Sequence, residues 1–154
     1  AHIMAKPFRW GILGAGGICN DFVNALRSTS AEVVAVGAST AEKAAQFAAT
    51  HSIPASHGSY AALANDASVD VVYVGTIHPM HYAHTKLCLE AGKHVVVEKP
   101  MAMNLKEATE MVELARSKKL FLMEGMWTRF FPAVRRAREL LKQGAIGEVV
   151  GLSS

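Results

Sequence analysis

The sequence predicts an α/β fold in which helices cover both faces of a doubly wound parallel sheet. Short β-branched runs alternate with helical stretches, most of these runs are apolar throughout, and the first one leads into a glycine-rich turn. This alternation implies right-handed crossovers between parallel strands. The expected strands are residues 8–13, 32–36, 71–74, 94–97 and 120–123, and a weak additional strand is expected near 55–56.

The length of 154 residues suits one domain with a hydrophobic core of its own. Residues 1–4 are interpreted as a remnant of cloning, and residues 5–154 as a single domain. A turn and a strand-like run over 148–152 are expected to begin a next domain, of which 147–154 would be the truncated start.

The composition excludes several classes of protein. With 51% hydrophobic and 19% charged residues, the chain is typical of a globular protein, and no apolar run is long enough to cross a bilayer. Cys19 and Cys88 have neither disulfide nor zinc spacing, which favours a reducing, cytoplasmic location. The net charge of +3 falls mainly on the outer faces of late helices without interleaved aromatic residues, so no nucleic-acid partner is expected.

The first expected strand runs into Gly14–Cys19, the G-x-G-x-x-G/A pattern with cysteine in its third slot. Gly14 permits a tight turn, and Gly16 lets a pyrophosphate approach the backbone. N–H groups at the start of the following helix would face this anion. In its strand–turn–helix context the pattern predicts a Rossmann dinucleotide-binding domain for a nicotinamide cofactor. The alternative is a glycine-rich turn without a ligand.

The residues after the second expected strand bear on the choice of cofactor. NAD-binding domains place an acid there for the ribose 2′-hydroxyl. This sequence has the hydroxyls of Ser39 and Thr40, the ammonium of Lys43, and no acid before Glu42. That set suits a 2′-phosphate and predicts NADP, with NAD as the alternative. Ser39 can also be a helix N-cap with Glu42 as its capping-box partner, and both interpretations can hold together.

Three histidines, His78, His81 and His84, follow the expected strand at 71–74. Three turns of a helix do not bring a histidine from each position to one point, and no carboxylate or cysteine accompanies them. We therefore expect no metal site, and interpret these residues as loop and helix-cap residues along the cofactor crevice.

The expected strand at 94–97 is followed by Glu98-Lys99-Pro100. Ligands of open parallel sheets bind beyond the carboxyl ends of the strands, so Lys99 is expected at the reactive end of the cofactor. Its ammonium could bond a substrate hydroxyl or carbonyl and stabilise a developing alkoxide, and burial would make its pKa tunable. The alternative is a structural pair between Lys99 and Glu98.

The sequence also predicts where the later helices begin and end. An apolar stripe over 104–118 predicts a helix, with Asn104 as its N-cap and Glu107 as a capping-box-like partner. Pro132 suits the first turn of the last long helix, and Gly144 suits the left-handed position after it.

With the glycine pattern, Glu98-Lys99-Pro100 and Trp127-Thr128-Arg129-Phe130-Phe131-Pro132 in place, the sequence resembles the N-terminal half of the glucose–fructose oxidoreductase / inositol dehydrogenase (Gfo/Idh/MocA) family. The resemblance spans nearly all of residues 8–154. The stretch 120–132 is similar to the branch of dihydrodiol dehydrogenases and NADP-dependent D-xylose dehydrogenases.

This resemblance implies an oxidoreductase that transfers a hydride between NADP and a sugar or trans-dihydrodiol. It implies that Lys99 assists catalysis, that its bond to Pro100 is cis, and that Trp127 and Arg129 close over the cofactor or substrate. Relatives often carry arginine where this chain has Ser39. The implied cofactor-binding residues are Gly14, Ala15, Gly16, Gly17, Ile18, Ser39, Thr40, Lys43, Gly75, Thr76, Ile77, His78, His81, Glu98, Lys99, Trp127 and Arg129.

The second half of that family, an open antiparallel α+β domain, supplies substrate contacts, most of the dimer interface and the remaining catalytic groups, and it has no counterpart in this sequence. We therefore expect cofactor binding with little or no turnover. Self-association is expected through the apolar surface that includes Trp127, Phe130 and Phe131. The alternatives are a non-catalytic dinucleotide-binding or sensor module, and a dehydrogenase of the same family acting on inositol, another polyol or a tetrapyrrole.

Overall fold

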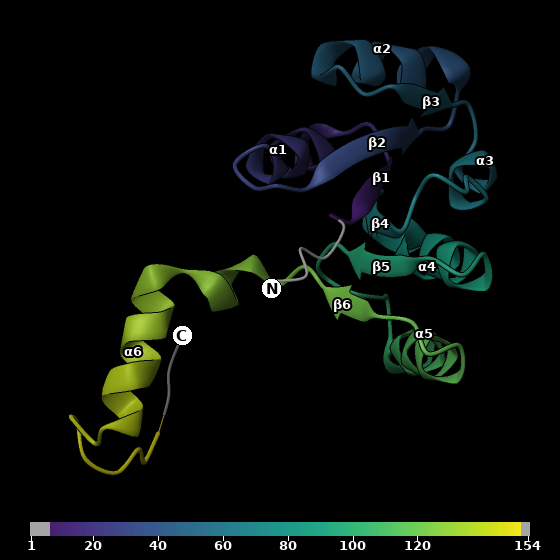
Figure 1. Cartoon of the computed structure of the whole chain (residues 1–154). Helices are drawn as coiled ribbons and strands as arrows, with labels where there is room; N and C mark the ends of the chain where they lie inside the picture. Colours follow the sequence, from purple (N-terminus) through teal and green to yellow (C-terminus); the bar gives the residue numbers. More distant parts are fainter. Residues whose placement is uncertain (1–6, 152–154) are drawn as a thin grey trace, which may run out of the picture.

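The computed structural model describes residues 7–151, and its centre is a six-stranded, all-parallel sheet with the order β3-β2-β1-β4-β5-β6 (Figure 1). The strand order reverses direction between β1 and β4, as it does in doubly wound folds. The strands are β1 (Arg9–Leu13), β2 (Glu32–Gly37), β3 (Ala55–His57), β4 (Val71–Val74), β5 (His94–Val97) and β6 (Leu122–Glu124). The helices are α1 (Gly17–Leu26), α2 (Ala41–His51), α3 (Tyr60–Ala64), α4 (His81–Glu90), α5 (Leu105–Ser117) and α6 (Pro132–Lys142), with short 3₁₀ helices η1 (His78–Met80) and η2 (Trp127–Phe130).

Two hydrophobic clusters lie on opposite faces of the sheet. Ile12 of β1 packs with residues of α1 and α2, such as Val23 and Phe47. The next residue, Leu13, belongs to the cluster on the other face, which includes Leu89 of α4 and Met111 of α5. Successive strand side chains point to opposite faces, so strands covered on both faces must be apolar at every position. The predicted doubly wound fold is confirmed.

All the strands expected for the sheet are present, and the bounds differ most for the last one. The weak strand near 55–56 forms as β3, paired with β2. The last strand begins at Leu122 rather than at Leu120, because the turn that closes the carboxyl end of α5 takes up Lys119 and Leu120. Lys119 adopts a left-handed φ of 57°, and the N–H of Leu120 bonds back to the carbonyl of Ala115 at 2.8 Å. The predicted cap of α5 is confirmed, since Asn104 accepts from the N–H of Glu107 at 3.0 Å.

The prediction of a strand over 148–152 is wrong for the residues that the structure describes. Residues 148–151 form no strand, and Val150 is 97% exposed; Leu152 and residues 1–4 lie outside the described range. A strand needs a neighbour that pairs with its N–H and C=O groups, and β6, the edge strand nearest in sequence, pairs only with β5. β propensity alone therefore does not order this segment.

The helix α6 projects away from the sheet (Figure 1), has no buried residue, and packs mainly against η2. Exposed apolar side chains run through this part of the chain and include Trp127, Phe130 and Phe131. Over residues 7–151, no helix combines the length and the apolar character that a membrane span requires.

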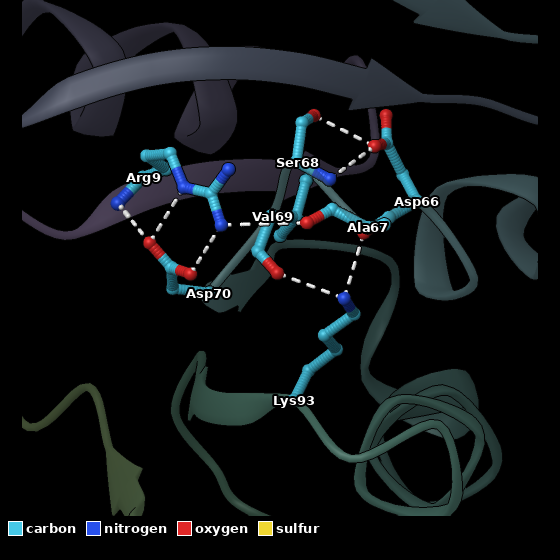
Figure 2. A network of polar contacts seen from close by, with 7 residues as sticks. All are labelled: Arg9, Asp66, Ala67, Ser68, Val69, Asp70 and Lys93. Atoms are coloured by element: carbon cyan, nitrogen blue, oxygen red, sulfur yellow. Dashed lines mark hydrogen bonds and ion pairs between the residues drawn. The ribbon is translucent and has the colours of Figure 1, made fainter.

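The amino ends of three strands are joined by a polar network (Figure 2). The Arg9 guanidinium bonds both carboxylate oxygens of Asp70, at 2.9 and 2.6 Å. The buried ammonium of Lys93 donates to the carbonyls of Asp66 and Val69, at 2.7 and 2.8 Å. Buried charges persist where hydrogen bonds replace water, so this end of the sheet is built for stability. The cavity described below lies at the opposite end of the sheet, beyond the carboxyl ends of the strands.

Candidate functional site

A cavity of about 850 Å³ lies beyond the carboxyl ends of β1, β2 and β4. In open α/β sheets this edge, at the point where the strand order reverses, is where ligands bind. The cavity is lined by the glycine turn and by residues after β2 and β4, together with one face of α2. The lining residues are Gly14, Ala15, Gly16, Gly17, Asn20, Ala38, Ser39, Lys43, Gln46, Phe47, Thr50, His51, Tyr60, Gly75, Thr76, Ile77, Met80 and His84.

The glycine turn is shaped by two different constraints. Gly14 has φ +122°, and a Cβ added there would lie 2.9 Å from the carbonyl oxygen of Gly75, so the turn itself requires glycine. A Cβ added at Gly16 would meet no atom within 4 Å. Gly16 is therefore not needed for packing, and its missing side chain leaves space on the cavity wall.

The helix α1 presents its amino end to this space. Gly16 is the N-cap and offers no side-chain acceptor, and the N–H of Asn20 bonds the Gly16 carbonyl at 3.1 Å to begin the helical ladder. The N–H groups before Asn20, including that of Ile18, therefore have no acceptor within the helix. Free N–H groups and the positive end of the helix dipole favour an anion such as a diphosphate.

Cys19, in the third slot of the pattern, joins the two loops that line the cavity. Its thiol donates to the Gly75 carbonyl at 3.3 Å, and a Cβ at Gly75 would lie 2.5 Å from the Cys19 sulfur. Burial raises the pKa of the Cys19 thiol to about 12, so Cys19 is a packing residue and not a nucleophile.

The N-cap of α2 is Thr40, and the predicted cap at Ser39 is wrong. The Thr40 hydroxyl accepts from the N–H of Lys43 at 3.3 Å. The side chain of Glu42 also lies at this helix start, where backbone N–H and the Thr40 hydroxyl lower the pKa of its carboxyl. Because Thr40 takes the capping role, Ser39 lines the cavity together with Lys43, whereas Thr40 does not line it.

The three histidines after β4 take different roles. His84 lines the cavity, and its Nδ1 lies 2.9 Å from the Thr76 hydroxyl. His81 is only 2% exposed and does not line the cavity; its ring nitrogens lie 2.7 Å from the carbonyl oxygen of Pro100 and 3.0 Å from that of Thr76. His78 also lies off the lining, with Nε2 3.0 Å from the Ala102 carbonyl. In the described part of the chain, no group of three or more His, Cys, Asp or Glu residues could hold a metal ion.

Burial, and then the charge of His81, lowers the pKa of His84. The ring of Tyr60 packs against His84 with 4.3 Å between centroids. Together they give the cavity an uncharged aromatic wall, suited to a flat base.

Several lining residues carry no motif and are missed by the sequence reasoning. Those on α2 follow a helical stripe that includes Lys43, Gln46, Phe47, Thr50 and His51. The 3.6-residue period would have found this stripe, since Lys43 alone marks which face of the helix is turned to the cavity. Nothing comparable in the sequence points to Tyr60.

Glu98 and Lys99 lie after β5, outside the cavity lining. The Glu98 carboxylate accepts from the Tyr73 hydroxyl at 2.6 Å and from the backbone N–H of Lys99 at 3.1 Å. The side chain of Lys99 is exposed, and within residues 7–151 it forms no ion pair with Glu98, so the structural pairing weighed above is wrong. The peptide bond from Lys99 to Pro100 is cis, as the resemblance implies.

Trp127 and Arg129 lie in η2, are exposed, and do not line the cavity. The Trp127 ring packs edge-on against Phe131 at 5.5 Å. The structure therefore brings together the glycine turn, Ser39, Lys43 and residues 75–77. It leaves Ile18, Thr40, His78, His81, Glu98, Lys99, Trp127 and Arg129 off the cavity lining.

Comparison with curated proteins finds trans-1,2-dihydrobenzene-1,2-diol dehydrogenases. The enzyme from Danio rerio is 53% identical over 144 residues, and that from Homo sapiens is 49% identical over 144 residues. Each alignment covers 92% of this chain and 43% of the relative. The chain therefore spans less than half the length of the curated relatives it matches.

Solved structures give the same fold. An NAD-binding oxidoreductase from Klebsiella pneumoniae matches with a TM-score of 0.86 and 28% identity, over 92% of this chain and 40% of that one. A 3-ketoreductase from Actinomadura kijaniata in complex with NADP and TDP-benzene matches with a TM-score of 0.85 and 31% identity, over 93% and 44%. A biliverdin reductase from Synechocystis in complex with biliverdin and NADP⁺ matches with a TM-score of 0.79 and 31% identity, over 94% and 45%.

A family model described as an oxidoreductase family with an NAD-binding Rossmann fold matches residues 8–126, which contain β1 to β6 and the glycine turn. The chain thus belongs to the Gfo/Idh/MocA oxidoreductase family and is an NAD(P)-binding domain related to dihydrodiol dehydrogenases.

Proposed function

We propose that this domain holds NADP for hydride transfer to or from a sugar or a trans-dihydrodiol. One observation carries the proposal: the uncapped amino end of α1 opens onto the cavity at Gly16, where a Cβ would meet nothing. A diphosphate fits this cradle because it would take the free N–H groups of the turn and occupy the space that side chains leave.

The preference for NADP over NAD is supported by the residues after β2. Ser39 and Lys43 line the cavity, and no carboxylate is among its lining residues. An ammonium and a hydroxyl can bond a 2′-phosphate, whereas an NAD site places an acid there. The NADP-bound ketoreductase and biliverdin reductase that this chain resembles agree with this choice.

Calorimetric titration with NADPH and NADH tests the cofactor. We expect NADPH to bind more tightly, and Lys43→Ala to weaken NADPH by about tenfold while leaving NADH unchanged. Lys86→Ala is the matched control, because Lys86 lies on α4 beside Glu110 and does not line the cavity. If neither dinucleotide binds, the proposal is wrong. If NADH binds more tightly than NADPH, the proposed preference for NADP is reversed.

The reaction is proposed from Lys99 and from the relatives. When bound, the dinucleotide would donate the hydride in a reduction or accept it in an oxidation, and the Lys99 ammonium would bond the substrate oxygen that gains or loses charge. The dihydrodiol dehydrogenases extend well beyond the region matched here. Because one lysine does not complete an acid–base pair, we propose that this chain alone binds the cofactor with little or no turnover. Rapid NADP-dependent oxidation of D-xylose or a dihydrodiol by this chain would refute that part.

Self-association is proposed through the surface formed by Trp127, Phe130 and Phe131, which are 60%, 51% and 42% exposed. Contiguous apolar area of this kind seldom stays open to water on a monomer. Sedimentation velocity should detect a dimer or larger species that Trp127→Ser with Phe130→Ser disperses. A monomer at all concentrations would count against it. The reducing, cytoplasmic location is likewise proposed, in keeping with the free thiols of Cys19 and Cys88.

A further inference from the structure

Tyr73 of β4 is a buried tyrosine whose hydroxyl reaches the turn that carries Lys99. It is 1% exposed, and its hydroxyl donates to Oε1 of Glu98 at 2.6 Å. A buried hydroxyl needs a partner, and an ionised carboxylate is among the stronger acceptors that a protein offers. The bond therefore fixes one oxygen of Glu98.

The ring of Tyr73 is itself held by the helix that begins at the glycine turn. Phe22 of α1 stacks on it with 3.7 Å between centroids and an interplanar angle of 3°. A Cβ at Gly75 would lie 2.7 Å from the Tyr73 ring and 2.5 Å from the Cys19 sulfur, so little space remains around the ring. Burial and the bond to Glu98 raise the pKa of Tyr73 far above its ordinary value, so the hydroxyl keeps its proton and remains a donor.

The second oxygen of Glu98 reaches Lys99. Its Oε2 accepts from the backbone N–H of Lys99 at 3.1 Å, so each carboxylate oxygen has a donor and the plane of the group is fixed. The Lys99 side chain has no ion pair among the described residues. The bond from Glu98 therefore holds the backbone from which this exposed side chain starts.

We propose that Tyr73 is a positioning residue for Lys99: through Glu98 it fastens the Lys99 backbone to α1, the helix that would bind the diphosphate. The inference rests on the proposed function: if the diphosphate binds at the glycine turn, the bond between Tyr73 and Glu98 would hold the Lys99 backbone at a fixed distance from it. Misplacement of a reacting group by about 1 Å can cost about a hundredfold in rate, so such a connection has catalytic value.

Tyr73→Phe separates this role from simple core packing, because it keeps the ring stacked on Phe22 and removes only the hydroxyl. Tyr82→Phe is the matched control: the Tyr82 hydroxyl also donates to a carboxylate, that of Glu110, but this bond joins α4 to α5 and neither residue lines the cavity. Both variants lose one tyrosine–glutamate bond, and only the first should affect Lys99.

The first measurement uses the chain without any dinucleotide. Hydrogen exchange of the Lys99 amide, followed by NMR, should become about tenfold faster in Tyr73→Phe and stay unchanged in Tyr82→Phe. Glu98→Gln should have a similar effect, and Glu98→Gln added to Tyr73→Phe should change little more, because both act through one bond. Unchanged Lys99 exchange in a folded Tyr73→Phe variant, or fully additive effects, would overturn the proposal.

The second measurement adds NADPH. If the wild-type chain binds it, Tyr73→Phe should alter the fluorescence of the reduced nicotinamide while changing the dissociation constant by less than about threefold, because the diphosphate contacts at Gly16 remain. An unchanged fluorescence with an altered Lys99 amide would also overturn a role in positioning Lys99 at the cofactor. Failure of the wild type to bind NADPH would instead refute the proposed function, and the exchange measurement would still decide the connection from Tyr73 to Lys99.

Discussion

The hydroxyl of Thr40 accepts a hydrogen bond from the N–H of Lys43, 3.3 Å away, and by capping α2 it leaves Ser39 on the cavity wall. Two adjacent hydroxyls thus have separate tasks, one in stability and one in ligand contact. From the sequence alone, both are grouped with Lys43 at the 2′-phosphate, and Ser39 rather than Thr40 is offered as the cap.

Replacing each hydroxyl in turn should separate these tasks. Thr40→Ala should lower the free energy of unfolding by about 1 kcal/mol, because an N-cap acceptor is lost. Ser39→Ala should leave stability nearly unchanged and weaken NADPH binding. Denaturant unfolding and calorimetric titration of the two variants make the comparison. Equal losses of stability would contradict the assignment of the cap to Thr40.

The glycines of the turn should respond in opposite ways to substitution. Gly16→Val should fold, since a Cβ there meets no atom within 4 Å, and should weaken NADPH by about tenfold or more because the side chain fills the diphosphate space. Gly14→Ala should cost about 1–3 kcal/mol of stability, because φ +122° strains a residue with a Cβ. Thermal unfolding with and without NADPH checks both variants. Gly16→Val that binds NADPH as the wild type does would remove the main support for the diphosphate site.

The positions of the strands and the glycine turn could be predicted because they depend on local patterns: apolar runs such as 71–74 and the spacing of Gly14 and Gly16. The predictions that failed depend on tertiary contacts. Leu120 is drawn into the end of α5 by its bond to Ala115, and 148–151 find no strand to pair with.

The candidate site divides in the same way. Ser39, Lys43 and residues 75–77 follow strand ends, so the sheet brings them to one edge. The sequence predicts His81 along the cofactor path, yet its ring is buried off the cavity lining and bonds two carbonyls, a placement that depends on the course of the loop at Pro100. Tyr60 reaches the cavity from a five-residue helix with no periodic signal.

The Asp66 carboxyl should make stability depend on pH at the acid end. Hydrogen bonds from the Ser68 side chain, followed by His57 and the Ser68 backbone, lower its pKa from 3.8 to about 2. Because the folded-state pKa lies below the unfolded value, this contribution is fully present above about pH 4 and is lost as the pH falls through about 2. Ser68→Ala should reduce the loss of unfolding free energy between those pH values. Unfolding by urea along a pH series measures it, and an identical pH profile in the variant would contradict the role of Ser68.

The two thiols should be unreactive while the domain is folded. Burial raises the pKa of both Cys19 and Cys88 to about 12, so almost no thiolate exists at neutral pH. A chromogenic disulfide reagent should therefore label neither cysteine in the native chain and both after unfolding in guanidinium. If NADPH binds at the glycine turn, it should slow labelling at Cys19 more than at Cys88 under mildly denaturing conditions, since Cys19 connects Gly75 to α1 at the cavity. Rapid labelling of Cys19 in the native chain would show that its thiol is not packed against Gly75, and the packing role given to this thiol would then be wrong.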